Sequence, residues 1–220
     1  DDSVLFFQHF TLSSPHGWEG KPIVHQSRSQ QQQSVAERER LIPLKAKLLA
    51  MREQRVRPGR DGKTLTDWNG LMIAALAEAG RSLARRDWID AAEQAFAHIS
   101  AANRDDRLPH SMLGPRTLFP ALSSDYAAMA NAAISLFEAS GDWTYIDHAS
   151  RFVEQLDLWH ADAAGTGYYL TASDSTDVPI RVRGDVDEAI PSATSQIIEA
   201  LVRLASVTGD DLDLQERAWK

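Results

Sequence analysis

The strongest constraint on the fold is a corner motif that recurs between helical segments. The corners are Arg86-Asp87-Trp88, Gly141-Asp142-Trp143 and Gly209-Asp210-Asp211, and their first aspartates lie 55 and 68 residues apart. An aspartate at a corner can accept hydrogen bonds from the first N–H groups of the next helix, an interaction worth about 1 kcal/mol. The sequence therefore predicts a repeating αα-hairpin with a short corner and a long return loop.

The apolar positions between the corners recur at helical spacing and predict a buried face for each helix. The expected faces are Trp68, Leu71, Ala75, Leu76, Ala79 and Leu83; Trp88, Ala91, Ala95 and Ile99; Tyr126, Met129, Ala133, Leu136 and Phe137; and Ile146, Ala149, Val153, Leu156 and Trp159. A further pair of helices is expected from about Ser192 to Ala205 and from Asp210 onward.

Units of this kind must stack on neighbours to bury their apolar faces. They can do so in an open solenoid or in a closed ring, and return loops gathered at one end favour the ring. We therefore expect a mainly α fold that holds part of an (α/α)6 toroid. Two short segments, Gly167–Thr171 and Val178–Arg183, predict a small β-hairpin at about 167–183 on its rim.

The N-terminal part of the chain has a different character. Residues 1–34 are predicted to be irregular, with a candidate strand at Val4–Phe7 and a Gln-rich loop at 26–34. Helical spacing begins at Val35, and Pro43 within it predicts that the helix starts near that residue or kinks there. The toroid part is expected to span residues 35–220.

Composition excludes several classes of protein. The formal net charge of −8 argues against binding of nucleic acid or of an anionic membrane surface. The chain has no cysteine, which excludes thiol catalysis, disulfides and Fe–S clusters, and its longest apolar run, at 71–77, is too short to span a bilayer. No spacing typical of a metal or nucleotide site occurs, so we expect no cofactor and no metal. We expect a cytoplasmic location, and the sequence ends suggest a piece of a longer protein.

Several blocks together resemble the YyaL/spermatogenesis-associated protein 20 family of thioredoxin-domain-containing proteins. The blocks are Arg57–Met72, Ser124–Ala127, the Gly-Tyr-Tyr segment from Gly167 and Asp187–Ser192, and they occur in the family's order. Two positions differ from the family pattern. Ala193-Thr194 stands where Gly-Asn is usual, and Gly62 precedes Lys63 where an acidic residue is usual.

The resemblance implies a thioredoxin-like domain in the parent chain, followed by a six-hairpin toroid. Such a toroid is similar to N-acylglucosamine 2-epimerases and six-hairpin glycosidases. It therefore suggests a carbohydrate-handling domain, either a glycoside hydrolase or a sugar isomerase. The alternative is a non-catalytic helical scaffold or binding domain beside the thioredoxin-like domain.

A sugar site needs carboxylates for proton transfer and aromatic rings for stacking. The candidate catalytic residues are Asp125, Asp187 and Asp61. The candidate substrate-binding residues are Trp68, Asn69, Tyr126, Arg60 and Asp185.

Structural alternatives stand beside these roles. Trp68 also fits the spacing of a first core residue, and the acids around Asp187 also fit a solvated loop. The candidate partners are a sugar or sugar acid, the thioredoxin-like domain and a second copy of the chain, because apolar faces left at the ends of a half ring favour association.

Overall fold

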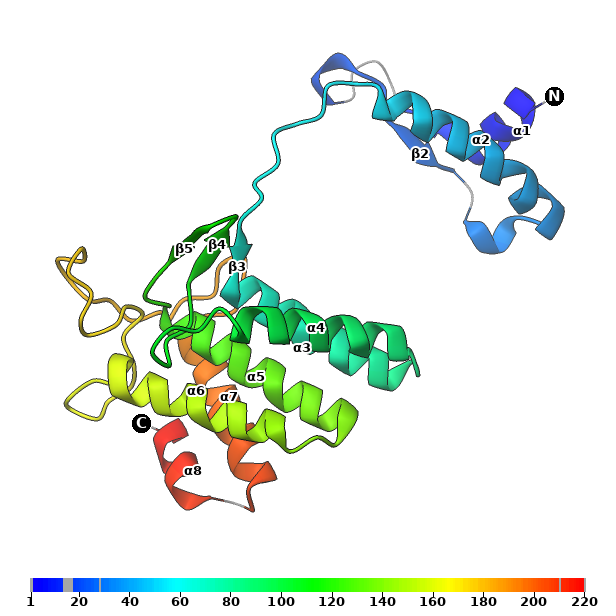
Figure 1. The fold of residues 1–220 in the computed structure, drawn as a ribbon. Coiled ribbons are helices and arrows are strands. Elements are labelled where there is room, and N and C mark those ends of the chain that lie inside the picture. The colour runs from blue at the N-terminus through cyan, green and yellow to red at the C-terminus, as the bar shows by residue number, and fades with distance from the viewer. Residues whose placement is uncertain (1, 14–17, 28, 210, 220) are drawn as a thin grey trace. The chain divides into compact units, whose positions relative to one another are not determined.

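The computed structural model describes residues 2–13, 18–27, 29–209 and 211–219. The chain divides into two compact units, residues 1–61 and residues 62–220 (Figure 1). Each unit is described by itself.

The first unit pairs two helices and a short hairpin. Helix α1 (Asp2–His9) leads into strand β1 (Phe10–Leu12), which is antiparallel to β2 (Val24–Gln26). Short 3-10 turns at Trp18–Gly20 and Gln30–Gln32 precede helix α2 (Val35–Glu53). The strand expected at Val4–Phe7 is wrong, since those residues belong to α1.

Helix α2 begins at Val35, where the helical spacing begins, so the alternative start near Pro43 is wrong. Ser34 and Glu37 form a capping box, in which the Ser34 N–H donates to Glu37 Oε2 at 2.8 Å. Pro43 lies inside the helix, and Leu41 is its one fully buried residue among those described. Helix α2 packs on α1, so the structure groups it with the first unit, and the helical array begins after Asp61.

The second unit contains the predicted αα-hairpins. Among the described residues these are α3 (Thr66–Ser82) with α4 (Arg86–Ser100), α5 (Ser123–Ser140) with α6 (Thr144–His160), and α7 (Ala193–Val207) with α8 (Leu212–Trp219). The second corner behaves as expected: Gly141 ends α5 with φ 77°, and Asp142 accepts a bond from Thr144 N–H at 3.0 Å. In the third corner Asp210 lies outside the described residues, while Asp211 accepts a bond from Asp213 N–H at 3.0 Å.

Helices α3, α5 and α7 run parallel to one another through the centre of the unit. Asp67 at the start of α3 bonds Asp125 at the start of α5, and Glu78 near the end of α3 bonds Ser135 near the end of α5. Contacts between α5 and α7 likewise progress in the same direction. The N-terminal ends of these inner helices therefore lie at one end of the array, as Figure 1 shows.

Helix α5 is buried on every side. All its residues from Ser123 to Leu136 are buried, because alanines occupy the positions that an amphipathic helix would turn to water. Small residues also let α3 approach closely: a Cβ added at Gly70 would lie 2.8 Å from two atoms of Ala128.

The buried face of α3 differs from the prediction. The buried residues of α3 are Thr66, Asp67, Gly70, Ile73, Ala77 and Gly80. The larger apolar side chains expected inside lie at the margin or in solvent, and Trp68 is 57% exposed. The face of α3 that meets α5 is therefore the one where glycine lets the two backbones approach closely, and not the one with the largest apolar side chains.

A three-stranded antiparallel sheet lies next to the start of α3. It is formed by β3 (Thr64–Leu65), β4 (Ser111–Leu113) and β5 (Arg116–Leu118) in that order. The β-hairpin expected at 167–183 is wrong: Leu170 N–H donates to the Val182 carbonyl at 2.8 Å, but no strand ladder forms there. The Arg181 guanidinium instead donates hydrogen bonds to the carbonyls of Thr171 and Trp159.

Candidate functional site

The concave surface at the N-terminal ends of the inner helices, called the mouth below, is the candidate site. The return loops before α5 and α7 end here, and a cavity of about 470 Å³ lies between them. Its lining is Leu122, Ser124, Leu170, Arg183, Gly184, Asp185, Val186, Glu188, Ile190, Pro191, Ser192 and Ala193. The mouth thus combines the first turns of α5 and α7 with a charged loop.

Asp125 lies beneath the mouth in the first turn of α5. Its side chain has no exposed surface, and its Oδ1 accepts the Asp67 N–H at 2.9 Å. Its Oδ2 accepts the Leu122 N–H at 2.7 Å and lies 2.9 Å from His110 Nδ1. Asp125 therefore joins α3, α5 and the loop that carries His110, and it cannot itself touch a ligand.

The His110–Asp125 pair has perturbed protonation. Burial raises the pKa of Asp125 to about 6, and the bond to His110 opposes that rise. The hydrogen bond to Asp125 raises the pKa of His110, against the effect of burial. The His110 side chain is 26% exposed. The pair thus links a buried carboxylate to an imidazole that solvent or a ligand can reach.

His110 was missed as a site residue by sequence reasoning. The sequence places it in a loop that could face the mouth, but no spacing marks it as a partner of Asp125. The backbone fixes its place: the Thr66 N–H donates to the His110 carbonyl at 3.0 Å, and the His110 N–H donates to Leu118 at 2.9 Å. Only the pairing of this loop with the start of α3 brings the His110 ring to Asp125.

Trp68 and Asn69 occupy the first turn of α3. Because Trp68 is more than half exposed, its alternative reading as a core residue is wrong. The Asn69 amide donates to the Leu65 carbonyl at 2.7 Å, so that group holds the helix start. Tyr126, by contrast, is fully buried and accepts the Leu108 N–H at 3.2 Å; its expected role as a sugar platform is wrong.

The acidic loop before α7 is held by its own carboxylates. Asp187 Oδ1 accepts the Ser192 N–H at 2.7 Å, and Asp185 Oδ1 accepts the Thr194 hydroxyl at 2.6 Å. Both residues remain exposed. Arg60 and Asp61, also expected at the site, belong to the first unit.

The described residues show two negative findings. They contain no group of three or more His, Cys, Asp or Glu side chains placed to hold a metal ion. None of their helices has the length and apolar composition needed to cross a membrane.

Solved structures with a similar fold include an epimerase and a glycoside hydrolase. Cellobiose 2-epimerase from Bacillus thermoamylovorans matches with a TM-score of 0.60 and 12% identity, covering 74% of this chain and 44% of that one. A family 76 glycoside hydrolase from Bacteroides thetaiotaomicron gives 0.59 and 14%, covering 74% and 36%. These likenesses confirm the prediction that the helical hairpins form part of an (α/α) toroid.

Sequence comparison identifies relatives of known name. No protein-family model matches the chain. Spermatogenesis-associated protein 20 of Rattus norvegicus and of Homo sapiens are each 29% identical over an alignment of 175 residues that covers 74% of this chain. The chain spans about a fifth (22%) of the length of these relatives. The resemblance predicted from the motifs is therefore confirmed: over three quarters of its length the chain is related to spermatogenesis-associated protein 20, in a six-hairpin glycosidase-like fold.

Proposed function

We propose that the mouth of this half toroid binds a carbohydrate, with sugar acids as the favoured class. The observation that carries the proposal is the His110–Asp125 pair beneath the rim. A buried carboxylate that holds a partly exposed imidazole fixes its ring and favours its protonated form. A protonated imidazole can hydrogen-bond the carboxylate of a sugar acid or exchange a proton with a sugar hydroxyl.

Each residue has a separate part in this proposal. His110 is the group that contacts the ligand, and Asp125 is a positioning residue because it is fully buried. Trp68 offers an exposed ring for stacking on a sugar face. Arg183, Asp185 and Glu188 line the adjoining cavity and supply both charge signs for hydrogen bonds to hydroxyls.

The alternative function is a non-catalytic helical scaffold, which the parent protein would join to a thioredoxin-like domain. The bonding of the mouth carboxylates favours it. Asp187 and Asp185 accept hydrogen bonds from Ser192 and Thr194 at the start of α7, so both carboxylates hold the loop to the helix without a ligand.

The test is thermal unfolding of the chain with a panel of neutral mono- and disaccharides and sugar acids. A ligand at 100 times its Kd adds about 2.7 kcal/mol, which for a protein of this size raises the Tm by roughly 5–10 °C. The shift should shrink in Trp68→Ala but not in the matched control Trp143→Ala, since Trp143 is 58% exposed at the corner between α5 and α6.

A pH series tests whether the charge of His110, and not only the packing of the ligand, contributes to binding. Binding of a sugar acid should weaken as the pH rises through the His110 pKa, and His110→Gln should remove that dependence. The absence of a shift with every sugar, or equal losses in both tryptophan variants, would favour the scaffold function.

A further inference from the structure

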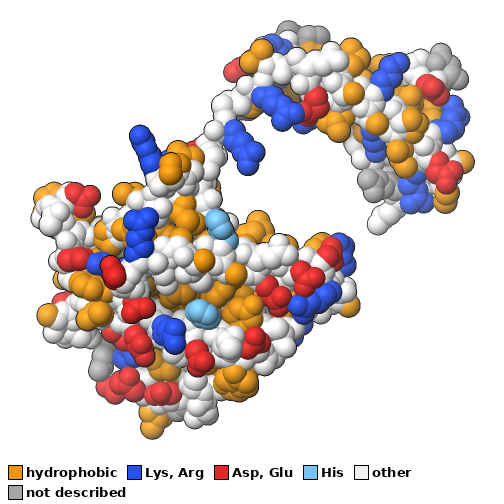
Figure 2. All heavy atoms as spheres, viewed as in Figure 1, with side chains coloured by type: hydrophobic (Ala, Val, Ile, Leu, Met, Phe, Trp, Pro, Cys, Tyr) orange, Lys and Arg blue, Asp and Glu red, His pale blue; other side chains and the backbone are white. Residues whose placement is uncertain are grey.

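A polar cavity of about 560 Å³, called the outer cavity below, lies between the end of α4 and the outer helix α6. Both of its walls come from the middle of the chain, residues 100–106 and 148–155, and it shares no lining residue with the mouth. Figure 2 shows charged side chains of both signs over α4 and α6. The volume lies within the roughly 300–1,000 Å³ that small-molecule sites occupy. The lining is Ser100, Asn103, Asp106, His148, Arg151, Phe152, Glu154 and Gln155.

Two rings and a hydroxyl form the less exposed part of the lining. The His148 ring stacks on Phe152 with centroids 6.2 Å apart. Burial, and after it the charge of Arg151, lowers the pKa of His148, so this ring is uncharged at neutral pH. The Ser100 hydroxyl is buried and has no hydrogen-bond partner among the described residues. A bound ligand or water can satisfy such a group.

The charged side chains of the outer cavity are unpaired. Asp106, Arg151 and Glu154 form no ion pair or hydrogen bond with another described residue. They come from two elements, since Asp106 follows α4 and the other two lie on α6. With His148 uncharged, the described lining carries two carboxylates and one guanidinium.

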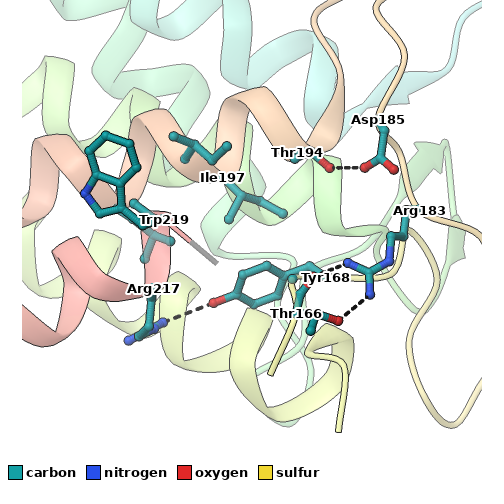
Figure 3. A pocket seen from close by; sticks show the side chains of 12 residues that line it. Thr166, Tyr168, Arg183, Asp185, Thr194, Ile197, Arg217 and Trp219 are labelled. Carbon is teal, nitrogen blue, oxygen red and sulfur yellow. Dashed lines mark hydrogen bonds between the residues drawn. The ribbon is translucent and has the colours of Figure 1, made fainter. Parts of the chain in front are cut away.

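The cavity of about 260 Å³ beside α7 and α8 shows the contrast. Figure 3 shows that its polar side chains bond one another, since Arg183 donates to Thr166 and Arg217 donates to Tyr168. Both arginines are also ion-paired. A ligand there would have to displace an existing partner, whereas a ligand in the outer cavity would meet groups that are free to bind it.

We propose that the outer cavity binds an amino acid with a basic side chain, of the chemistry of arginine or lysine. Such a ligand carries two cationic groups and one carboxylate, which is the complement of the charges in the lining. Arg151 binds the ligand carboxylate through parallel N–H groups. Asp106 and Glu154 bind the α-ammonium and the side-chain cation, and the stem of the ligand lies along the His148 ring. The proposal does not depend on sugar binding at the mouth.

The first test is calorimetric titration of the full 220-residue chain with arginine, lysine, citrulline and argininamide at low salt. We expect arginine and lysine to bind. Citrulline has the shape of arginine without its side-chain charge, and argininamide lacks the carboxylate, so each should bind about 10-fold or more weakly than arginine, as for the loss of a charged hydrogen bond. Added salt should weaken the binding of arginine, because the charged groups are exposed.

The second test locates the site. Arg151→Gln should weaken arginine binding about 10-fold and should also remove the difference between arginine and argininamide. The matched control is Arg116→Gln, an exposed arginine on β5 outside the cavity, and it should bind as the wild type does. In nuclear magnetic resonance spectra the His148 ring signals should move as arginine is added, and those of the exposed His98 should not. Circular dichroism checks that each variant stays folded.

Other outcomes overturn the proposal. The absence of both heat and signal changes with arginine and lysine at millimolar concentrations overturns it. Equal binding of citrulline would show that the side-chain charge is not recognised, and an equal loss in Arg116→Gln would show a response to net charge and not to this cavity. Binding of a neutral sugar that Arg151→Gln abolishes would assign the cavity to a carbohydrate instead. Sugar-dependent shifts at the mouth should be unchanged in Arg151→Gln, so the two proposals can fail separately.

Discussion

Gly70→Ala tests whether the close contact between α3 and α5 determines the packing of the array. An added Cβ would lie 2.8 Å from the carbonyl carbon and the Cβ of Ala128 and 3.0 Å from its oxygen. Carbon atoms normally meet at about 3.5–4.0 Å, so the helices would have to separate by roughly 0.7 Å or more. Helix α5 is buried on every side and has little room to retreat.

Two opposing effects set the expected size. Overpacking of this kind costs about 1–3 kcal/mol, whereas replacing glycine by alanine in a helix gains up to about 1 kcal/mol. Since the contacted atoms are mostly backbone, we expect the cost to prevail by about 1–2 kcal/mol. At about 2–4 °C per kcal/mol, the Tm should fall by several degrees.

The assay is guanidinium unfolding followed by circular dichroism, with the variant Gly70→Ala/Ala128→Gly as the control. Removing the Ala128 methyl relieves one of the close contacts, so Gly70→Ala should cost less in that background. A Gly70→Ala protein more stable than the wild type would refute the reasoning, because helix propensity alone would then account for the change.

The remaining predictions concern pH and capping. Because burial raises the pKa of Asp125 to about 6, the folded state binds its proton more tightly than the unfolded chain does. The free energy of unfolding should therefore fall as the pH rises from 3.8 to about 6. Asp125→Asn should flatten that part of the pH dependence measured by urea unfolding. His160 acts in the opposite direction. Burial lowers its pKa to about 4, so stability is lost as the pH falls from 6.5 toward 4, and His160→Asn, whose amide can still donate to the Tyr169 carbonyl, should flatten this loss. An unchanged profile in either variant would contradict that assignment. Ser192→Ala removes the cap of α7, in which Ser192 accepts the Ser195 N–H at 3.1 Å, and should lower the free energy of unfolding by about 1 kcal/mol, whereas the exposed Ser206→Ala should change it by less than about 0.5 kcal/mol.

The hairpin repeat was predictable because its signals are local. Gly141 and Asp142 act within a few residues of where they stand, so the second corner can be found without knowledge of the neighbours. The same locality explains the capping of α2 by Ser34.

The buried faces and the site were harder to predict because they depend on contacts between distant segments. Glycine at position 70 lets α3 meet α5 along a stripe of small residues, which a search for large apolar side chains passes over. The sequence places Asp125 in the first turn of a helix, yet two of its three partners are 15 and 58 positions away. Tyr126 follows it in sequence but turns into the core.

The complete burial of α5 has a consequence for motion at the mouth. We expect amide hydrogens in its middle turns to exchange with water only when whole hairpins separate, so that their exchange rates report the opening of the array and not local fraying. Asp125 shares that immobility, since it sits at the head of the same helix. Any change of shape at the mouth must therefore come from the loops that line it, above all residues 161–192. The Asp125 carboxylate beneath them is expected to stay in place.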